Sequence, residues 1–338
     1  MAEVKTDATP KRSDSLEFLS GRTIGLIIST GILVCVLTVQ SPHSFITKDA
    51  LFFITRQIGL AALVALSQAV CLTVGGMNLS VGGIGSITTV VLGLSLQNWG
   101  LPPALAVPIA LGVGIAAGAL NGLIITKLKI DSFIVTLSMM FVYMGLRAGI
   151  SGGAPYEVHD SFGLIGQGRV FGFSYVFLVV GAVLLASGFM YRCTIFGRHM
   201  LATGGNTSAA RLSGINTDRT IFRANVLSGF FASLAAVLYA SRNLSAAPET
   251  GDAWLIVSFA VAIIGGTGLQ GGVVSALGIF MGATIYTLIE YGLVQFKQVP
   301  PAYMKSFLGG LVLLAVVVDR AREIVTEKRT REAPPPTQ

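Results

Sequence analysis

The stretch RCTIFGRHMLATGGNTSAARLSGINTDRTIFR, residues 192–223, is a polar island between two long apolar segments. Each flanking segment has the length and composition of a helix that crosses a lipid bilayer. The island is therefore the part of the chain that can meet a soluble partner.

Composition places the whole chain in a membrane. Hydrophobic residues make up 53% of the 338 residues, charged residues 12%, and the mean hydropathy is +0.75. Soluble domains carry about a quarter charged residues, so the long apolar segments predict an all-α polytopic membrane protein. Lys and Arg cluster at the termini and in the island rather than alternating with aromatic residues. The net charge of +7 therefore does not indicate nucleic-acid binding.

Hydropathy predicts about ten transmembrane helices, some of them broken at Gly-rich sites. The expected spans are 23–41, 52–74, 81–97, 102–125, 133–150, 172–191, 224–241, 253–267, 272–293 and 304–318. The predicted domains are an N-terminal tail (1–22), a transmembrane domain (23–318) that contains the 192–223 loop, and a C-terminal tail (319–338). An even number of spans puts both tails on the same side as the island. That side carries most of the 23 Lys and Arg residues and is therefore predicted to be cytoplasmic.

The island itself predicts a short surface helix. Asn206, Thr207 and Ser208 are residue types that cap a helix start, and Gly214 readily adopts the left-handed stop. Between them, Ala209 and Leu212 lie three residues apart and can face one partner while Arg211 points elsewhere. Such a short helix needs a docking surface to be stable. A plain basic loop that sets the membrane topology is the simpler alternative.

A glycine pattern, GGxxLxxG, occurs twice. Its first copy is Gly75, Gly76, Leu79 and Gly82, and its second is Gly265, Gly266, Leu269 and Gly272. Paired glycines break a helix, and the exposed backbone must then face protein or a water-filled path. Two breaks in matching positions indicate a translocation path, although tight turns between spans need the same glycines. The polar neighbours that could bind a hydroxyl-rich solute are Asn78, Ser80, Thr267 and Gln270.

The segment GRHMLATGGNTSAARLSGI, residues 197–215, resembles a signature of the permease subunits of bacterial ABC importers for ribose, xylose, galactose and similar monosaccharides. VGGMNLSVGG, residues 74–83, is similar to another element of that family, and the likeness extends over residues 60–320. The resemblance implies a cytoplasmic coupling helix that binds the ATPase subunit. The coupling residues would be Gly204, Gly205, Asn206, Ala209, Ala210, Arg211, Leu212, Ser213 and Gly214.

The same resemblance implies an assembly in the bacterial inner membrane. Its parts would be two ATPase subunits, a second copy or paralogue of the permease, and a periplasmic sugar-binding protein. The loop 151–171 could receive the binding protein or be a solvated connector. Two departures bear on the substrate: Asn78 stands where the family usually has Asp, and 255–258 replaces an acidic ELDA-like segment.

No catalytic or metal-binding residues are predicted. The chain has no GxxxxGK[ST] phosphate loop, so ATP and Mg²⁺ are expected on the partner ATPase and no cofactor on this chain. Cys35, Cys71 and Cys193 are scattered, and the three His residues form no nucleophile set.

The alternative is a secondary transporter driven by an ion gradient, and a third possibility is an assembly protein. A proton-coupled carrier generally needs an ionisable group within the membrane. Glu290 is the only carboxylate expected inside a span, and it lies near the outer end, where Lys297 or Lys305 could pair with it.

Overall fold

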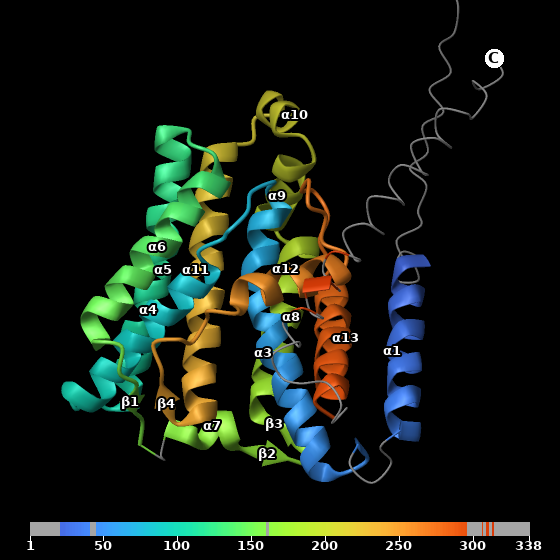
Figure 1. Ribbon diagram of the computed structural model, residues 1–338. Coiled ribbons are helices and arrows are strands. Elements are labelled where there is room, and N and C mark those ends of the chain that lie inside the picture. The colour runs from blue at the N-terminus through green and yellow to red at the C-terminus, as the bar shows by residue number, and fades with distance from the viewer. Residues whose placement is uncertain are drawn as a thin grey trace, which may run out of the picture.

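Helix α3 (Lys48–Thr73) lies in the interior of the helical bundle in the computed structural model of the protein (Figure 1). The structure describes residues 21–40, 45–159 and 162–295, together with positions 306, 309, 310 and 313. Neighbouring α8, α11, α12 and α13 all contact α3. In its most apolar stretch of 18 residues, 72% of α3 is buried, against 6% for α1 at the edge of the bundle. The 26 residues of α3 are about 39 Å long, enough to cross a bilayer.

The remaining elements are nearly all helical. The helices besides α3 are α1 (Gly21–Gln40), α4 (Val81–Gly93), the π-helix η2 (Leu94–Asn98), α5 (Pro103–Leu128), α6 (Ser132–Ser151), α7 (Gly163–Gln167), α8 (Tyr175–Cys193), α9 (Ile195–Gly205), α10 (Thr207–Leu212), α11 (Thr217–Asn243), α12 (Trp254–Ile264) and α13 (Ala276–Gln295). The strands are β1 (Tyr156–Glu157), β2 (Arg169–Val170), β3 (Phe173–Ser174) and β4 (Ser245–Ala246).

Among the described residues, seven helices are long and apolar enough to span a membrane, which agrees with a polytopic membrane protein. These helices are α1, α3, α5, α6, α8, α11 and α13. The third expected span (81–97) is present as α4 continued by η2, whereas the eighth (253–267) is shorter than predicted, because α12 has 11 residues. The tenth expected span (304–318), Lys297 and Lys305 fall outside the described residues apart from the four isolated positions. The number of ten spans therefore stays a prediction.

The loop between α6 and α8 is more ordered than a plain connector. Strand β1 pairs antiparallel with β4, and β2 with β3. The Ser241 hydroxyl in α11 donates to the Phe162 carbonyl, just before α7, and accepts from Gly166 N within α7. These bonds tie the loop to the end of the bundle that lies opposite α9 and α10 (Figure 1).

Helices α5 and α11 pack through glycines. Gly114, Gly118 and Gly122 recur every four residues on α5 and all face α11. A Cβ at Gly118 would overlap the Asn225 carbonyl oxygen, and one at Gly122 would lie 3.0 Å from Asn225 Cβ. Small residues at this spacing let membrane helices approach closely, because dispersion between backbones replaces the hydrophobic effect.

This packing makes a prediction for α5. Gly118→Ala should lower the free energy of unfolding by about 1–3 kcal/mol, because the overlap outweighs the better helix propensity of Ala. Gly112→Ala on the same helix, where nothing lies within 4 Å of the new Cβ, should be neutral or stabilising. The thermal midpoint of each variant in detergent micelles tests this. Equal shifts for the two variants would contradict close packing at Gly118.

Candidate functional site

The polar island contains two helices rather than one. Helix α8 runs on to Cys193, and α9 follows at once, with the Thr194 hydroxyl accepting from Gly197 N at 3.1 Å. Sequence reasoning missed α9 because it treated the segment up to Gly204 as a loop. The missed signals are the capping Thr194 and the buried positions Met200 and Thr203, three residues apart.

The short helix predicted after Asn206 is present as α10. The Asn206 side chain accepts from Ala209 N at 2.9 Å, and Gly214 has φ of +82°. Ile215 N donates to the Ala210 carbonyl at 3.0 Å, which closes the C-terminal end. Both caps thus have the residue types and conformations that the sequence predicted.

Helix α10 projects from the end of the bundle (Figure 1). It exposes a large apolar side chain. Leu212 is 91% exposed and Ala209 is exposed, whereas Ala210 is buried against the rest of the protein. Arg211 turns back and donates to the Thr217 hydroxyl at 2.8 Å and to Asp218 at 3.3 Å. Helix α10 therefore presents the apolar Leu212 to a partner, while the charge of Arg211 is directed back to Thr217 and Asp218.

The two glycine patterns coincide with helix ends. Helix α3 ends at Thr73, Gly75 has φ of +79°, and α4 starts at Val81. At the second pattern α12 ends at Ile264, and positive φ angles follow at Gly266, Gly271 and Gly272 before α13 begins. Helices thus end at both patterns, which agrees with a break within a span and equally with a tight turn between spans. The part of these glycines in a translocation path stays a prediction.

The two breaks meet each other and the end of α9. Gly272 N donates to the Thr73 carbonyl at 3.0 Å. A Cβ at Gly204 would overlap that carbonyl and lie 2.6 Å from Gly272 N, and a Cβ at Gly271 would lie 2.9 Å from Gly75 N. We call these five residues (Thr73, Gly75, Gly204, Gly271 and Gly272) the glycine junction. Local sequence patterns did not reveal that the three glycine-rich sites join.

A buried polar network holds the first break. Asn78 Nδ2 donates to Ser228 Oγ at 2.8 Å, and Asn78 Oδ1 accepts from Ser80 N at 3.0 Å and Ser80 Oγ at 2.6 Å. Asn121 Nδ2 donates to Ser80 Oγ at 2.7 Å, and Tyr143 Oη donates to Asn121 Oδ1 at 2.9 Å. All five side chains are buried. The network therefore joins α5, α6 and α11 to the start of α4 inside the bundle.

The other predicted path residues lie in different surroundings. Gly76 follows the end of α3, where Met77 N donates to the Ser132 hydroxyl at 3.1 Å. Thr267 is fully buried, and its hydroxyl has no hydrogen-bond partner within the described part of the chain. Gln270, in the same loop, is exposed. Asn78 and Ser80 thus share one network, whereas Thr267 and Gln270 belong to the loop before α13.

Acidic residues do precede α12, at positions before the segment 255–258 where the family resemblance predicted them. Glu249 and Asp252 lie in the turns before Trp254, and Asp252 Oδ1 pairs with Arg147 Nη1 at 2.6 Å. The same Arg147 nitrogen donates to the Pro248 carbonyl. Charged groups are therefore present close to α12 even though 255–258 is apolar.

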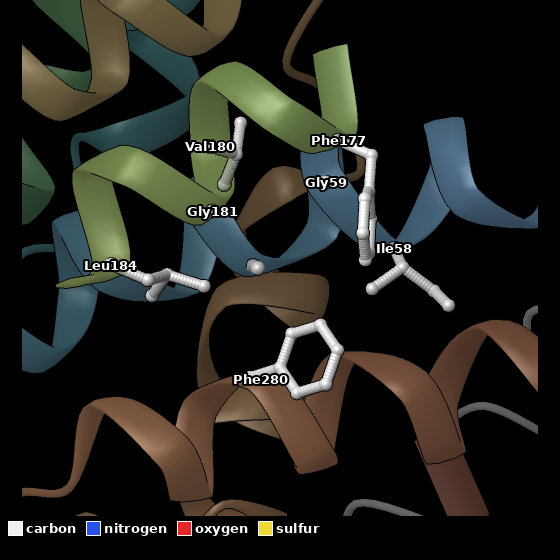
Figure 2. A pocket seen from close by; sticks show the side chains of 8 residues that line it. Ile58, Gly59, Phe177, Val180, Gly181, Leu184 and Phe280 are labelled. Atoms are coloured by element: carbon white, nitrogen blue, oxygen red, sulfur yellow. The ribbon is translucent and has the colours of Figure 1, made fainter. Parts of the chain in front are cut away.

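An apolar crevice lies between α3, α8 and α13 (Figure 2). Its lining residues are Ile58, Gly59, Ala62, Phe177, Val180, Gly181, Leu184 and Phe280. None of these side chains can hydrogen-bond a solute, so the crevice does not suit a hydroxyl-rich ligand.

Long apolar helices, two glycine-rich sites at which helices end, and a capped polar helix at one end of the bundle are typical of a polytopic membrane permease. The chain belongs to the family described as branched-chain amino acid transport system / permease component, which matches residues 50–317.

Similar proteins include the ribose import permease protein RbsC of Escherichia coli (strain K12), 33% identical over 88% of this chain and 93% of that protein. The autoinducer 2 import system permease protein LsrC of Klebsiella pneumoniae is 33% identical over 89% of this chain and 86% of that protein. The L-arabinose transport system permease protein AraH of Escherichia coli (strain K12) is 30% identical over 96% of this chain and 98% of that protein. No solved structure matches the chain. The family resemblance inferred from residues 60–320 is thereby confirmed.

The polar network yields a stability prediction. Asn78→Leu should lower the free energy of unfolding by about 1–3 kcal/mol, because Ser80 and Ser228 each lose one of their buried hydrogen-bond partners. Asn98→Leu, at an exposed position at the end of η2, should change it by less than about 0.5 kcal/mol. Thermal denaturation of purified protein measures both. A tolerated Asn78→Leu would show that the network does not hold the break.

Proposed function

We propose that this chain is the translocating subunit of a bacterial ABC importer for a monosaccharide or a related polyol. ATP and Mg²⁺ bind to separate ATPase subunits, and this chain carries no cofactor and no catalytic residue of its own. The observation that carries the proposal is α10, a helix capped at both ends that holds Leu212 91% exposed beyond the bundle. The relatives named for ribose import and for L-arabinose transport support the substrate class.

The coupling surface of the proposal is the end of α9 together with α10. Its residues are Gly204, Gly205, Asn206, Ala209, Ala210, Arg211, Leu212, Ser213 and Gly214. Ala209 and Leu212 contact a groove of the ATPase, and the buried Ala210 holds α10 on the permease. Burying one Leu contributes about 1.5–3 kcal/mol, which makes Leu212 the largest single apolar contribution on this helix.

The proposed orientation puts α9, α10 and both termini in the cytoplasm, with the protein in the inner membrane. The support is the charge of this end: basic residues outnumber acidic ones in its described loops and helix ends. The basic residues are Lys127, Lys129, Arg192, Arg198, Arg211, Arg219 and Arg223. Asp218 pairs with Lys129 and Arg211, which leaves several of the other charges to interact with lipid headgroups.

The solute passes between this chain and a second permease copy or paralogue, after delivery by a periplasmic sugar-binding protein. The proposed path residues are Gly75, Gly76, Asn78, Ser80, Gly265, Gly266, Thr267 and Gln270. Their polar groups are neutral donors and acceptors, which suit hydroxyls better than ions. The buried Thr267 hydroxyl, which lacks a partner within the described ranges, supports a role at the second break.

The orientation can be tested with two engineered thiols in a chain whose natural cysteines are replaced by serine. Ser208→Cys at α10 and Leu164→Cys at α7 are both exposed and lie at opposite ends of the bundle. A membrane-impermeant maleimide added to intact cells should label Leu164→Cys and spare Ser208→Cys until the inner membrane is permeabilised. The reverse pattern would remove the coupling role of α10.

The coupling surface can be tested by removing its apolar tip. Leu212→Ser should weaken ATPase binding to the detergent-solubilised permease by about 10-fold or more, because the complex loses the apolar contact between Leu212 and the ATPase. Leu164→Ser, an equally large change at the opposite end, should leave ATPase binding unchanged. Equal ATPase binding by both variants would contradict the proposed coupling surface. A separate outcome, solute accumulation driven by an ion gradient alone, would contradict an ABC importer.

A further inference from the structure

The end of α9 touches both helix breaks through backbone atoms. Gly204 lies against the hydrogen bond that joins Gly272 N to the Thr73 carbonyl, so a Cβ there would meet both groups. On the other side, a Cβ at Gly272 would lie 2.8 Å from Gly205 Cα. Side chains can yield by changing rotamer, whereas backbones in contact must move together.

We propose that α9 transmits the movement of the coupling surface, and that Gly204 is the positioning residue that makes both helix breaks move at once. This inference rests on the proposed function and names its mechanical route. A displacement of α9 shifts the end of α3 and the loop before α13 together, because the glycine junction leaves no space between them.

Asn206 connects the coupling surface to α9 without a flexible linker. Its backbone N–H donates to the Ala202 carbonyl of α9 at 3.1 Å, while its side chain caps α10. One residue thus ends the first helix and starts the second. A force on α10 therefore reaches Gly204, which lies two residues before Asn206.

Two buried hydroxyls lie next to glycines, one at the end of α9 and one in the second break. Thr203, beside Gly204, and Thr267, beside Gly266, are both fully buried, and neither hydroxyl has a partner among the residues described. Buried hydroxyls without partners are uncommon in stable packing. We take them as groups that gain partners when α9 moves, so that the junction has a second arrangement.

The test compares two helical glycines in the complete importer, reconstituted with its ATPase and its binding protein. Gly204→Ala places a methyl group in the junction, whereas Gly112→Ala in α5 places one where nothing lies within 4 Å. Gly204→Ala should reduce solute uptake 10-fold or more while the ATPase still binds, because α10 is unchanged. Gly112→Ala should keep uptake within twofold. Equal uptake by the two variants would overturn the inference.

A second pair of variants covers the case in which Gly204→Ala does not assemble. Thr203→Val removes the unpartnered hydroxyl at nearly constant shape. It should leave the thermal midpoint equal or higher and lower uptake at least threefold, because the second arrangement loses a hydrogen bond. Thr88→Val removes a comparable buried hydroxyl in α4 and should keep uptake unchanged. Unchanged uptake in Thr203→Val would also overturn the inference.

These outcomes are distinct from a failure of the proposed function. If Leu212→Ser abolishes ATPase binding while Gly204→Ala transports normally, the importer stands and the route through α9 is wrong. If neither Leu212→Ser nor Gly204→Ala affects ATP-driven uptake, the coupling surface and the route through α9 are both wrong. If uptake does not depend on ATP, the proposed function itself is wrong.

Discussion

Backbone groups that leave a helix inside a membrane protein must find partners within the protein, because lipid offers none. The structure meets this constraint at both breaks. After α3, Met77 N and Leu79 N donate to the hydroxyls of Ser132 and Thr136 on α6. After α12, Thr267 N donates to the Ala262 carbonyl, and the loop closes on itself and on Thr73. The arrangement of α3, α6, α12 and α13 follows from these bonds.

Glycine makes the same arrangement possible in a second way. Where the two breaks meet α9, the contacts are between backbones. Where α5 meets α11, three glycines of α5 present no Cβ to α11. In both places close approach replaces side-chain packing. The high glycine content of the chain, 41 residues, therefore has two separate uses: closeness between helices and left-handed turns at their ends.

The features predicted from sequence were those with a local cause. Runs of about 20 apolar residues predicted the long helices, and Asn206 with Gly214 predicted both ends of α10. Helix α9 was missed because Gly204 and Gly205 were taken as loop residues, although their lack of a Cβ serves contact with the two breaks. The meeting of Gly75 with Gly271 depends on residues almost two hundred positions apart. No local pattern encodes such a contact, and the partners of Asn78 and Arg147 were hidden for the same reason.

The network around Asn78 has a consequence for energetics. Its hydrogen bonds run between amides, serine hydroxyls and a tyrosine hydroxyl, none of which carries a charge at neutral pH. Shifting an uncharged network across part of the bilayer does no work against the transmembrane voltage, whereas one elementary charge would involve about 2.3 kcal/mol per 100 mV. Rearrangement at this site is thus electrically silent, and its rate should follow the mechanical load on the helices, independent of the electrical state of the cell.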